Sequence, residues 1–254
     1  MRLTARQLNR ATLARQLLLE RAHLDVVPAT EAIGGMQAQE PASPYLALWT
    51  RLHDFDPERL TRALLERKLV KATLGRSTLH IVSAADYRAT VTALLAVTRS
   101  RWMQERRGRP VERSLPELTE DLLAYASEPR TNVQLRDHAG TLGEPVPADE
   151  LWRRIRRYGA FVHVPVDEPW AFGRRPIQVA ARAWLPGPEP DRDVALEHLV
   201  RTHMRAFGPS RLPDIAQWSG LAIGHLRRGL ERITGVVTYE DTMGRELFDL
   251  PGQP

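Results

Sequence analysis

The stretch LPDIAQWSGLAIGHLRRGLERI, residues 212–233, decides the fold of this chain. Its first part has helical spacing, and Gly220 stands where a tight turn between two helices needs a positive φ. Ala216 is small, as the close crossing of two helices requires. The second helix carries an apolar stripe made of Ile223, Leu226, Leu230 and Ile233. Arg227 and Arg228 lie outside that stripe, and the whole pattern predicts a helix-turn-helix motif.

A β-hairpin is predicted directly after this motif. Two short runs of strand-forming residues, VVTYE (236–240) and ELFDL (246–250), flank a turn at Met243-Gly244. A helix-turn-helix followed by such a hairpin, or wing, makes a winged-helix unit.

The same order of elements occurs near the start of the chain. Residues 56–58, Asp-Pro-Glu, predict a helix start with an N-cap and a proline in the first turn. The segment KATLGRSTLHIV, residues 71–82, then predicts two alternating strands around a Gly75-Arg76-Ser77 turn.

A further unit is predicted in the middle of the chain. Residues 116–126 and 147–159 have helical spacing, and the second helix ends at a glycine C-cap. The runs FVHVPV (161–166) and WAF (170–172) predict the strands of a second wing. Residues 173–193 are rich in proline and glycine and are expected to form a linker.

We therefore expect a mainly α-helical protein with short β-hairpins, built of tandem winged helix-turn-helix units. The expected units are residues 1–85, 86–185 and 190–254. The three hairpin turns are unevenly spaced along the chain, so the pattern is a divergent repeat and not a solenoid.

The composition restricts the function. The 254 residues include no cysteine, which excludes disulfides, thiolate metal sites and cysteine nucleophiles. No signal-type or membrane-spanning apolar run is present, so a cytoplasmic protein is expected. The histidine spacing forms no metal set and no nucleotide fingerprint occurs, so neither metal nor cofactor is expected. The formal net charge is +5 and the basic residues are almost all arginine; biased codon usage and phosphate binding both explain this.

Four stretches carry a resemblance to a known family: GGMQAQEP (34–41), GRSTLHIV (75–82), the Trp-Arg-Arg helix (151–159) and RAFGPSRLPDIAQWSGL (205–221). On these motifs the chain resembles the winged-helix family that includes the azinomycin-crosslink DNA glycosylase and its bacterial relatives. The resemblance implies a DNA-repair enzyme that releases bulky alkylated bases. Family members usually continue past the third hairpin, and we expect that C-terminal region to be absent here.

The resemblance places the catalytic element at Gln37-Ala38-Gln39, because the family's signature is a short Gln-x-Gln or Gln-x-Asp element. In an extended segment, residues i and i+2 point the same way, so two amides could grip one water or one sugar oxygen. An N7-alkylated purine is already cationic and leaves readily, so positioning water suffices. Glu40 is the nearest carboxylate and a weaker candidate for a base. The alternative is that both glutamines are solvated loop residues.

Arginine clusters and the first hairpin turn are the candidate DNA contacts. They are Arg76, Ser77, Thr78 and His80 of the first hairpin, Arg153, Arg154, Arg156 and Arg157 of the second unit, and Arg227 and Arg228 of the third. Two interpretations of His80 stay open, since it either packs at the hairpin base or reaches a phosphate. At least one unit is expected to serve as scaffold or dimer surface and never to touch DNA.

Two functions of different class remain open. The favoured one is a monofunctional DNA glycosylase, a hydrolase that cleaves the N-glycosidic bond of bulky N7-alkylated purines or of interstrand crosslinks in double-stranded DNA. The alternative is a non-catalytic winged-helix DNA-binding protein or regulator, and a weaker third is a scaffold whose wings bind other proteins. DNA binding would associate the protein with the nucleoid. The sequence identifies neither the lesion, nor the oligomeric state, nor whether the base is flipped.

Overall fold

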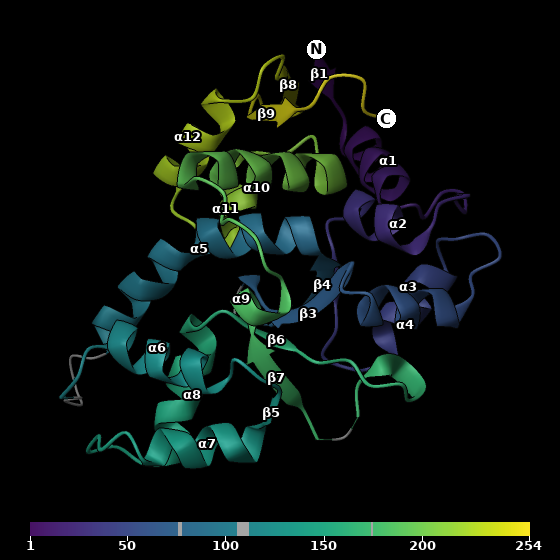
Figure 1. Cartoon of the computed structure of the whole chain (residues 1–254). Helices are drawn as coiled ribbons and strands as arrows, with labels where there is room; N and C mark the ends of the chain where they lie inside the picture. The colour runs from purple at the N-terminus through teal and green to yellow at the C-terminus, as the bar shows by residue number, and fades with distance from the viewer. Residues whose placement is uncertain (76–77, 106–111, 174) are drawn as a thin grey trace.

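The computed structural model describes residues 1–75, 78–105, 112–173 and 175–254. Helices dominate and surround a small central sheet, which confirms a mainly α-helical protein with short β-hairpins (Figure 1). The two ends of the chain lie near each other in Figure 1. None of the helices in these ranges is both long enough and apolar enough to span a membrane.

The helices follow the chain in three groups. The first group is α1 (Ala5–Arg15), α2 (Val26–Ala32), α3 (Ser43–Trp49) and α4 (Pro57–Leu65). The second is α5 (Ala84–Glu105), α6 (Leu115–Tyr125), α7 (Asn132–Gly140), α8 (Ala148–Tyr158), the short 3-10 helix η3 (Pro169–Ala171) and α9 (Ala181–Trp184). The third is α10 (Arg192–Phe207), α11 (Leu212–Ser219) and α12 (Ile223–Glu231).

Local sequence signals set the ends of several of these helices. The Asp56 carboxylate accepts a hydrogen bond of 2.9 Å from the Glu58 N–H and caps α4. Gly220 has a φ of 79° between α11 and α12, a left-handed conformation that glycine adopts without strain. Gly159 is the C-cap of α8. The predicted helix start, tight turn and C-cap are therefore confirmed.

A sheet of six described strands lies at the centre, in the order β2-β4-β3-β6-β7-β5. Its strands are β2 (Met36–Gln37), β3 (Leu69–Thr73), β4 (Leu79–Ser83), β5 (Arg130–Thr131), β6 (Phe161–His163) and β7 (Ile177–Ala180). The first predicted hairpin is β3–β4. Because β3 also pairs with β6, Lys71 lies opposite His163, and the first two predicted hairpins share one sheet.

The second hairpin differs from its sequence prediction. Residues 170–172 were expected as a strand, but they belong to η3 and its end, where Trp170 has a φ of 68° that no strand accommodates. The partner of β6 is instead β7, which lies inside residues 173–193. That range is therefore not the expected linker, since it also contains α9. Val179, 2% exposed, explains the difference, because a short apolar run between prolines and glycines still pairs when it enters the core.

The third predicted hairpin is confirmed and forms a separate small sheet. This sheet has the order β1-β8-β9, with strands β1 (Arg2–Leu3), β8 (Val237–Asp241) and β9 (Glu246–Asp249). Since β1 runs parallel to β8, the start of the chain closes against its last hairpin. Arg15 of α1 reinforces this closure through a buried ion pair with Asp249, with 2.6 Å between Nη2 and Oδ2.

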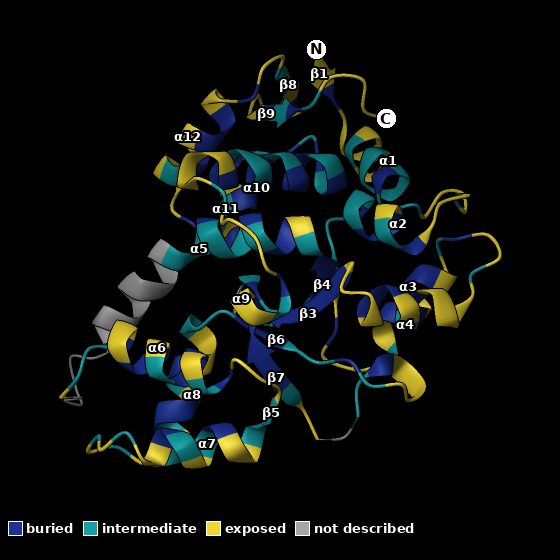
Figure 2. Cartoon of the chain, viewed as in Figure 1, coloured by how far each residue is buried: buried dark blue, intermediate teal, exposed yellow. Residues whose placement is uncertain are grey.

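Buried apolar side chains form four clusters, visible as the dark blue segments of Figure 2. Three of them are built mainly on α2–α4, on α6–α8 and on α10–α12. The fourth lies where the central sheet meets α5 and α9. Each of the first three falls mainly within one expected unit, while the unit boundaries themselves stay a prediction.

Candidate active site

Two glycines fix the backbone that leads into the Gln-Ala-Gln element. Gly34 and Gly35 have φ values of 75° and 90°, which side chains of L-residues rarely tolerate. A Cβ on Gly35 would lie 2.6 Å from Cγ1 of Val82, and one on Gly34 would lie 2.9 Å from Cβ of Ala206. These close approaches hold the segment between β4 and α10, so the residues that follow are rigidly placed.

Gln37 lies directly opposite His80 in the antiparallel pair of β2 and β4. Directly opposed residues of such a pair project from the same face of the sheet. The Gln37 side chain is exposed and makes no hydrogen bond within the part of the chain that the structure describes. Its amide is thus available to a ligand.

A cavity of about 260 Å³ is lined by both Gln37 and His80. It lies where β2 and β4 meet α5, α10 and the end of α11. The tip of the first hairpin reaches the same place, because a Cβ on Gly75 would lie 3.4 Å from the Trp218 carbonyl oxygen. The cavity therefore joins the first predicted wing to the helix-turn-helix of the third unit.

Gln39 occupies a different position from Gln37. Both side chains are exposed and Ala38 between them is 1% exposed, as expected for alternation along an extended segment. The Oε1 atom of Gln39 accepts a hydrogen bond of 2.8 Å from the Leu79 N–H, whereas Gln39 is absent from the cavity lining. Gln39 thus fastens the element to β4, and Gln37 is the amide that faces the cavity.

The first hairpin turn is described only in part. Arg76 and Ser77 lie outside the described residues. Thr78 donates a hydrogen bond of 3.2 Å from Oγ1 to the Gly75 carbonyl oxygen. His80 is half-buried and its Nδ1 lies 3.0 Å from the Thr78 carbonyl oxygen, which is the backbone contact expected at a hairpin base.

The other predicted DNA contacts lie on two helices and do not line the cavity. On α8, Arg153, Arg156 and Arg157 are exposed, while Arg154 is paired with Glu150. Burial and the neighbouring arginines lower the pKa of Arg156. On α12, Arg227 and Arg228 are exposed. The predicted apolar stripe of α12 is buried at Leu226, Leu230 and Ile233, whereas Ile223 at its start is 42% exposed.

The aromatic wall of the cavity was not predicted as part of a site. Phe207 and Trp218 line it, with ring centroids 6.2 Å apart. His203 packs against both rings, and burial lowers its pKa to about 4, so this histidine is neutral at pH 7. The motif RAFGPS…WSGL contains these aromatic residues, but only the folded chain brings them beside Gln37.

Asp86 is the second lining residue that the sequence did not single out. It lies in the first turn of α5 and is 4% exposed. Its carboxylate pairs with His198 of α10, with 2.6 Å between Oδ1 and Nε2. The two residues are 112 positions apart in the chain, so no local pattern could have paired them.

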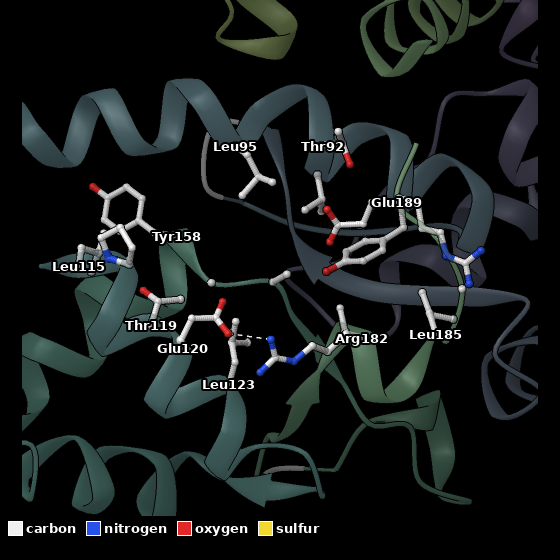
Figure 3. A pocket seen from close by; sticks show the side chains of 18 residues that line it. Thr92, Leu95, Leu115, Thr119, Glu120, Leu123, Tyr158, Arg182, Leu185 and Glu189 are labelled. Carbon is white, nitrogen blue, oxygen red and sulfur yellow. Dashed lines mark hydrogen bonds and ion pairs between the residues drawn. The ribbon is translucent and has the colours of Figure 1, made fainter. Parts of the chain in front are cut away.

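A second cavity of about 290 Å³ lies among α5, α6 and α9 and contains none of the predicted site residues (Figure 3). Its charged groups largely neutralise each other, as in the 2.7 Å ion pair between Glu120 and Arg182 that Figure 3 marks. Among the described residues, no group of histidine, aspartate and glutamate side chains could hold a metal ion. The cavity at Gln37 is therefore the candidate active site.

The comparisons place this architecture among the DNA glycosylases. The family model described as "DNA glycosylase AlkZ-like" matches residues 30–254, and the chain belongs to this family. A solved structure, the Streptomyces sahachiroi DNA glycosylase AlkZ, is similar over 99% of this chain and 71% of that chain. The TM-score is 0.80 at 18% sequence identity, so this likeness shows the fold. No curated protein matches the chain.

Proposed function

We propose that the protein is a monofunctional DNA glycosylase that hydrolyses the N-glycosidic bond of bulky N7-alkylated purines or of interstrand crosslinks in double-stranded DNA. The observation that carries the proposal is the exposed amide of Gln37 at a cavity lined by His80 and aromatic rings. Membership of a DNA glycosylase family supports the same activity.

The reaction asks little of the enzyme, because an N7-alkylated purine is cationic and departs as a neutral base. The transition state has oxocarbenium character at the sugar, as in O-glycoside hydrolysis. Gln37 would orient the attacking water or a sugar oxygen through its amide. Gln39 would hold the element against β4 through its bond to Leu79.

DNA would be held by the predicted winged-helix units, through the exposed arginines of α8 and α12 and through the first hairpin. Arginine suits this task because its planar fork matches phosphate oxygens. In this proposal the tandem units 1–85, 86–185 and 190–254 grip the duplex, and the chemistry takes place where the first and third units meet. The protein would act without metal or cofactor, in the cytoplasm and at the nucleoid.

The experiment is base excision on defined duplexes that carry either one N7-methylguanine or one bulky N7 adduct, with undamaged duplex as control. We expect alkali-labile abasic sites with the damaged duplexes alone. The bulky adduct should be the better substrate. A protein that binds these duplexes yet leaves every alkylated base in place would be a DNA-binding regulator instead.

A further inference from the structure

Asp86 is a buried carboxylate at the wall of the same cavity as Gln37 and His80. The N–H of Asp86 donates a hydrogen bond of 3.2 Å to the Ser83 hydroxyl, which anchors the first turn of α5 behind the cavity. Its side chain is 6% exposed. The carboxylate is therefore held in place by α5 and has little contact with bulk water.

Only one of the two carboxylate oxygens of Asp86 is satisfied. Oδ1 lies 2.6 Å from Nε2 of His198, whereas Oδ2 has no hydrogen-bond partner among the described residues. The nearest cation, Nη2 of Arg205, is 3.9 Å from Oδ2, beyond hydrogen-bond distance. A buried carboxylate oxygen without a donor is costly, so such groups call for an explanation.

We propose that Asp86 is the general base of the glycosylase reaction, and this inference rests on the function proposed above. Gln37 would hold a water in the cavity, and Oδ2 of Asp86 would accept its proton. The water oxygen forms a bond to the C1′ carbon of the deoxyribose while the C1′–N9 bond breaks. The electron pair of the broken bond leaves with the alkylpurine, which departs neutral, and the proton stays on Asp86.

The pair with His198 supports this role. The His198 side chain is 35% exposed, so it connects the buried carboxylate to solvent and can take up the proton after each turnover. The negative charge of Asp86 also lies on the cavity wall where the sugar becomes cationic, which favours the transition state. The titratable or charged groups that face this carboxylate are His80 from β4 and His198 and Arg205 from α10.

A purely structural role is the alternative, because the Asp86–His198 contact also ties α5 to α10. Asp86→Asn separates the two roles, since asparagine keeps the shape and can still accept a hydrogen bond from His198. Asp249→Asn is the matched control, because Asp249 is also a buried, paired carboxylate, 3% exposed, but does not line the cavity.

The test is single-turnover excision of N7-methylguanine from duplex DNA across about pH 5 to 8, corrected for the folded fraction. We expect Asp86→Asn to lower the rate by about 100-fold or more and to remove the acid limb of the wild-type pH profile. Asp249→Asn should keep the rate and the profile. Asp86→Glu should restore the acid limb, and it keeps the test decisive if the asparagine variant does not fold.

A folded Asp86→Asn variant with the wild-type rate and pH profile would overturn the inference while leaving the glycosylase function intact. A folded Asp86→Glu variant without an acid limb would overturn it as well. A wild-type protein that excises no alkylated base would overturn the proposed function itself, and the role of Asp86 with it.

Discussion

Gln37 and His80 face each other across the β2–β4 pair, and both side chains line one cavity. The pairing register therefore positions the amide to which we assign the catalytic role. Any change that shifts β2 against β4 should alter the chemistry before it unfolds the protein.

Gly35→Ala is the most direct change of this kind. The new Cβ would lie 2.6 Å from Cγ1 of Val82 and would also strain a residue at φ 90°. We expect a loss of about 1–3 kcal/mol in the free energy of unfolding and a larger proportional loss of excision. Gly143→Ala has the same kind of backbone strain at φ 77° with nothing within 4 Å, so excision by that variant should stay normal. Urea unfolding and excision assays on both variants check this, and equal losses of excision would refute it.

The two arginine-bearing helices are expected to contribute separately to DNA binding. Replacing exposed Arg227 and Arg228 together with alanine removes up to two phosphate contacts. The slope of log affinity against log salt should then fall by about one to two, equally for all DNA sequences. The matching pair Arg153 and Arg157 on α8 serves as the comparison. A helix whose double variant leaves the slope unchanged is scaffold.

The buried pair Arg15–Asp249 should dominate the stability of the closure between the chain ends. Both side chains are nearly inaccessible, at 2% and 4%, so Arg15→Met would leave an unpaired buried carboxylate. We expect a loss of about 3–5 kcal/mol in the free energy of unfolding. The exposed pair Arg2–Glu240 provides the contrast, and Arg2→Ala should change stability by less than about 1 kcal/mol. Urea titrations that give equal losses for the two variants would contradict this ranking.

Two buried histidines make the protein sensitive to mild acid. Burial lowers the pKa of His163 to about 3 and that of His203 to about 4, from 6.5 in both cases. The unfolded chain binds these protons first, so the stability they contribute is complete above about pH 6.5 and is lost as the pH falls towards 4. Each histidine should cost up to ~1.4 kcal/mol per pH unit in this window. Melting temperatures at about pH 7 and 5 should therefore differ, and His203→Gln should reduce the difference.

The sequence predicted the elements whose causes are local. The Asp56 cap, the Gly220 turn and the third hairpin each depend on a few neighbouring residues, and all three are confirmed. The β7 strand was missed because its four residues stand between prolines and glycines, and its stability comes from pairing with β6. The β3–β6 pairing that merges two hairpins is likewise a tertiary event that no periodicity indicates.

The candidate site divides in the same way. Gln37 and Gln39 were predicted from the family's motif, and the structure gives them different surroundings that the motif does not distinguish. Asp86 was not predicted, because its partner His198 is distant in the chain and its burial depends on the packing of α5 against α10. A carboxylate at a helix start is ordinarily solvated, so no local pattern selects this one.

The rate of single-turnover excision by Gln37→Ala tests the central claim most directly. With N7-methylguanine in duplex DNA, the rate should fall by about tenfold or more, equivalent to at least ~1.4 kcal/mol of transition-state stabilisation. DNA affinity should stay nearly unchanged, because the amide acts on water or sugar and not on phosphates. Gln217→Ala, which removes an exposed amide that does not line the cavity, should excise at the wild-type rate. Excision at the wild-type rate by folded Gln37→Ala would contradict the catalytic role of this residue.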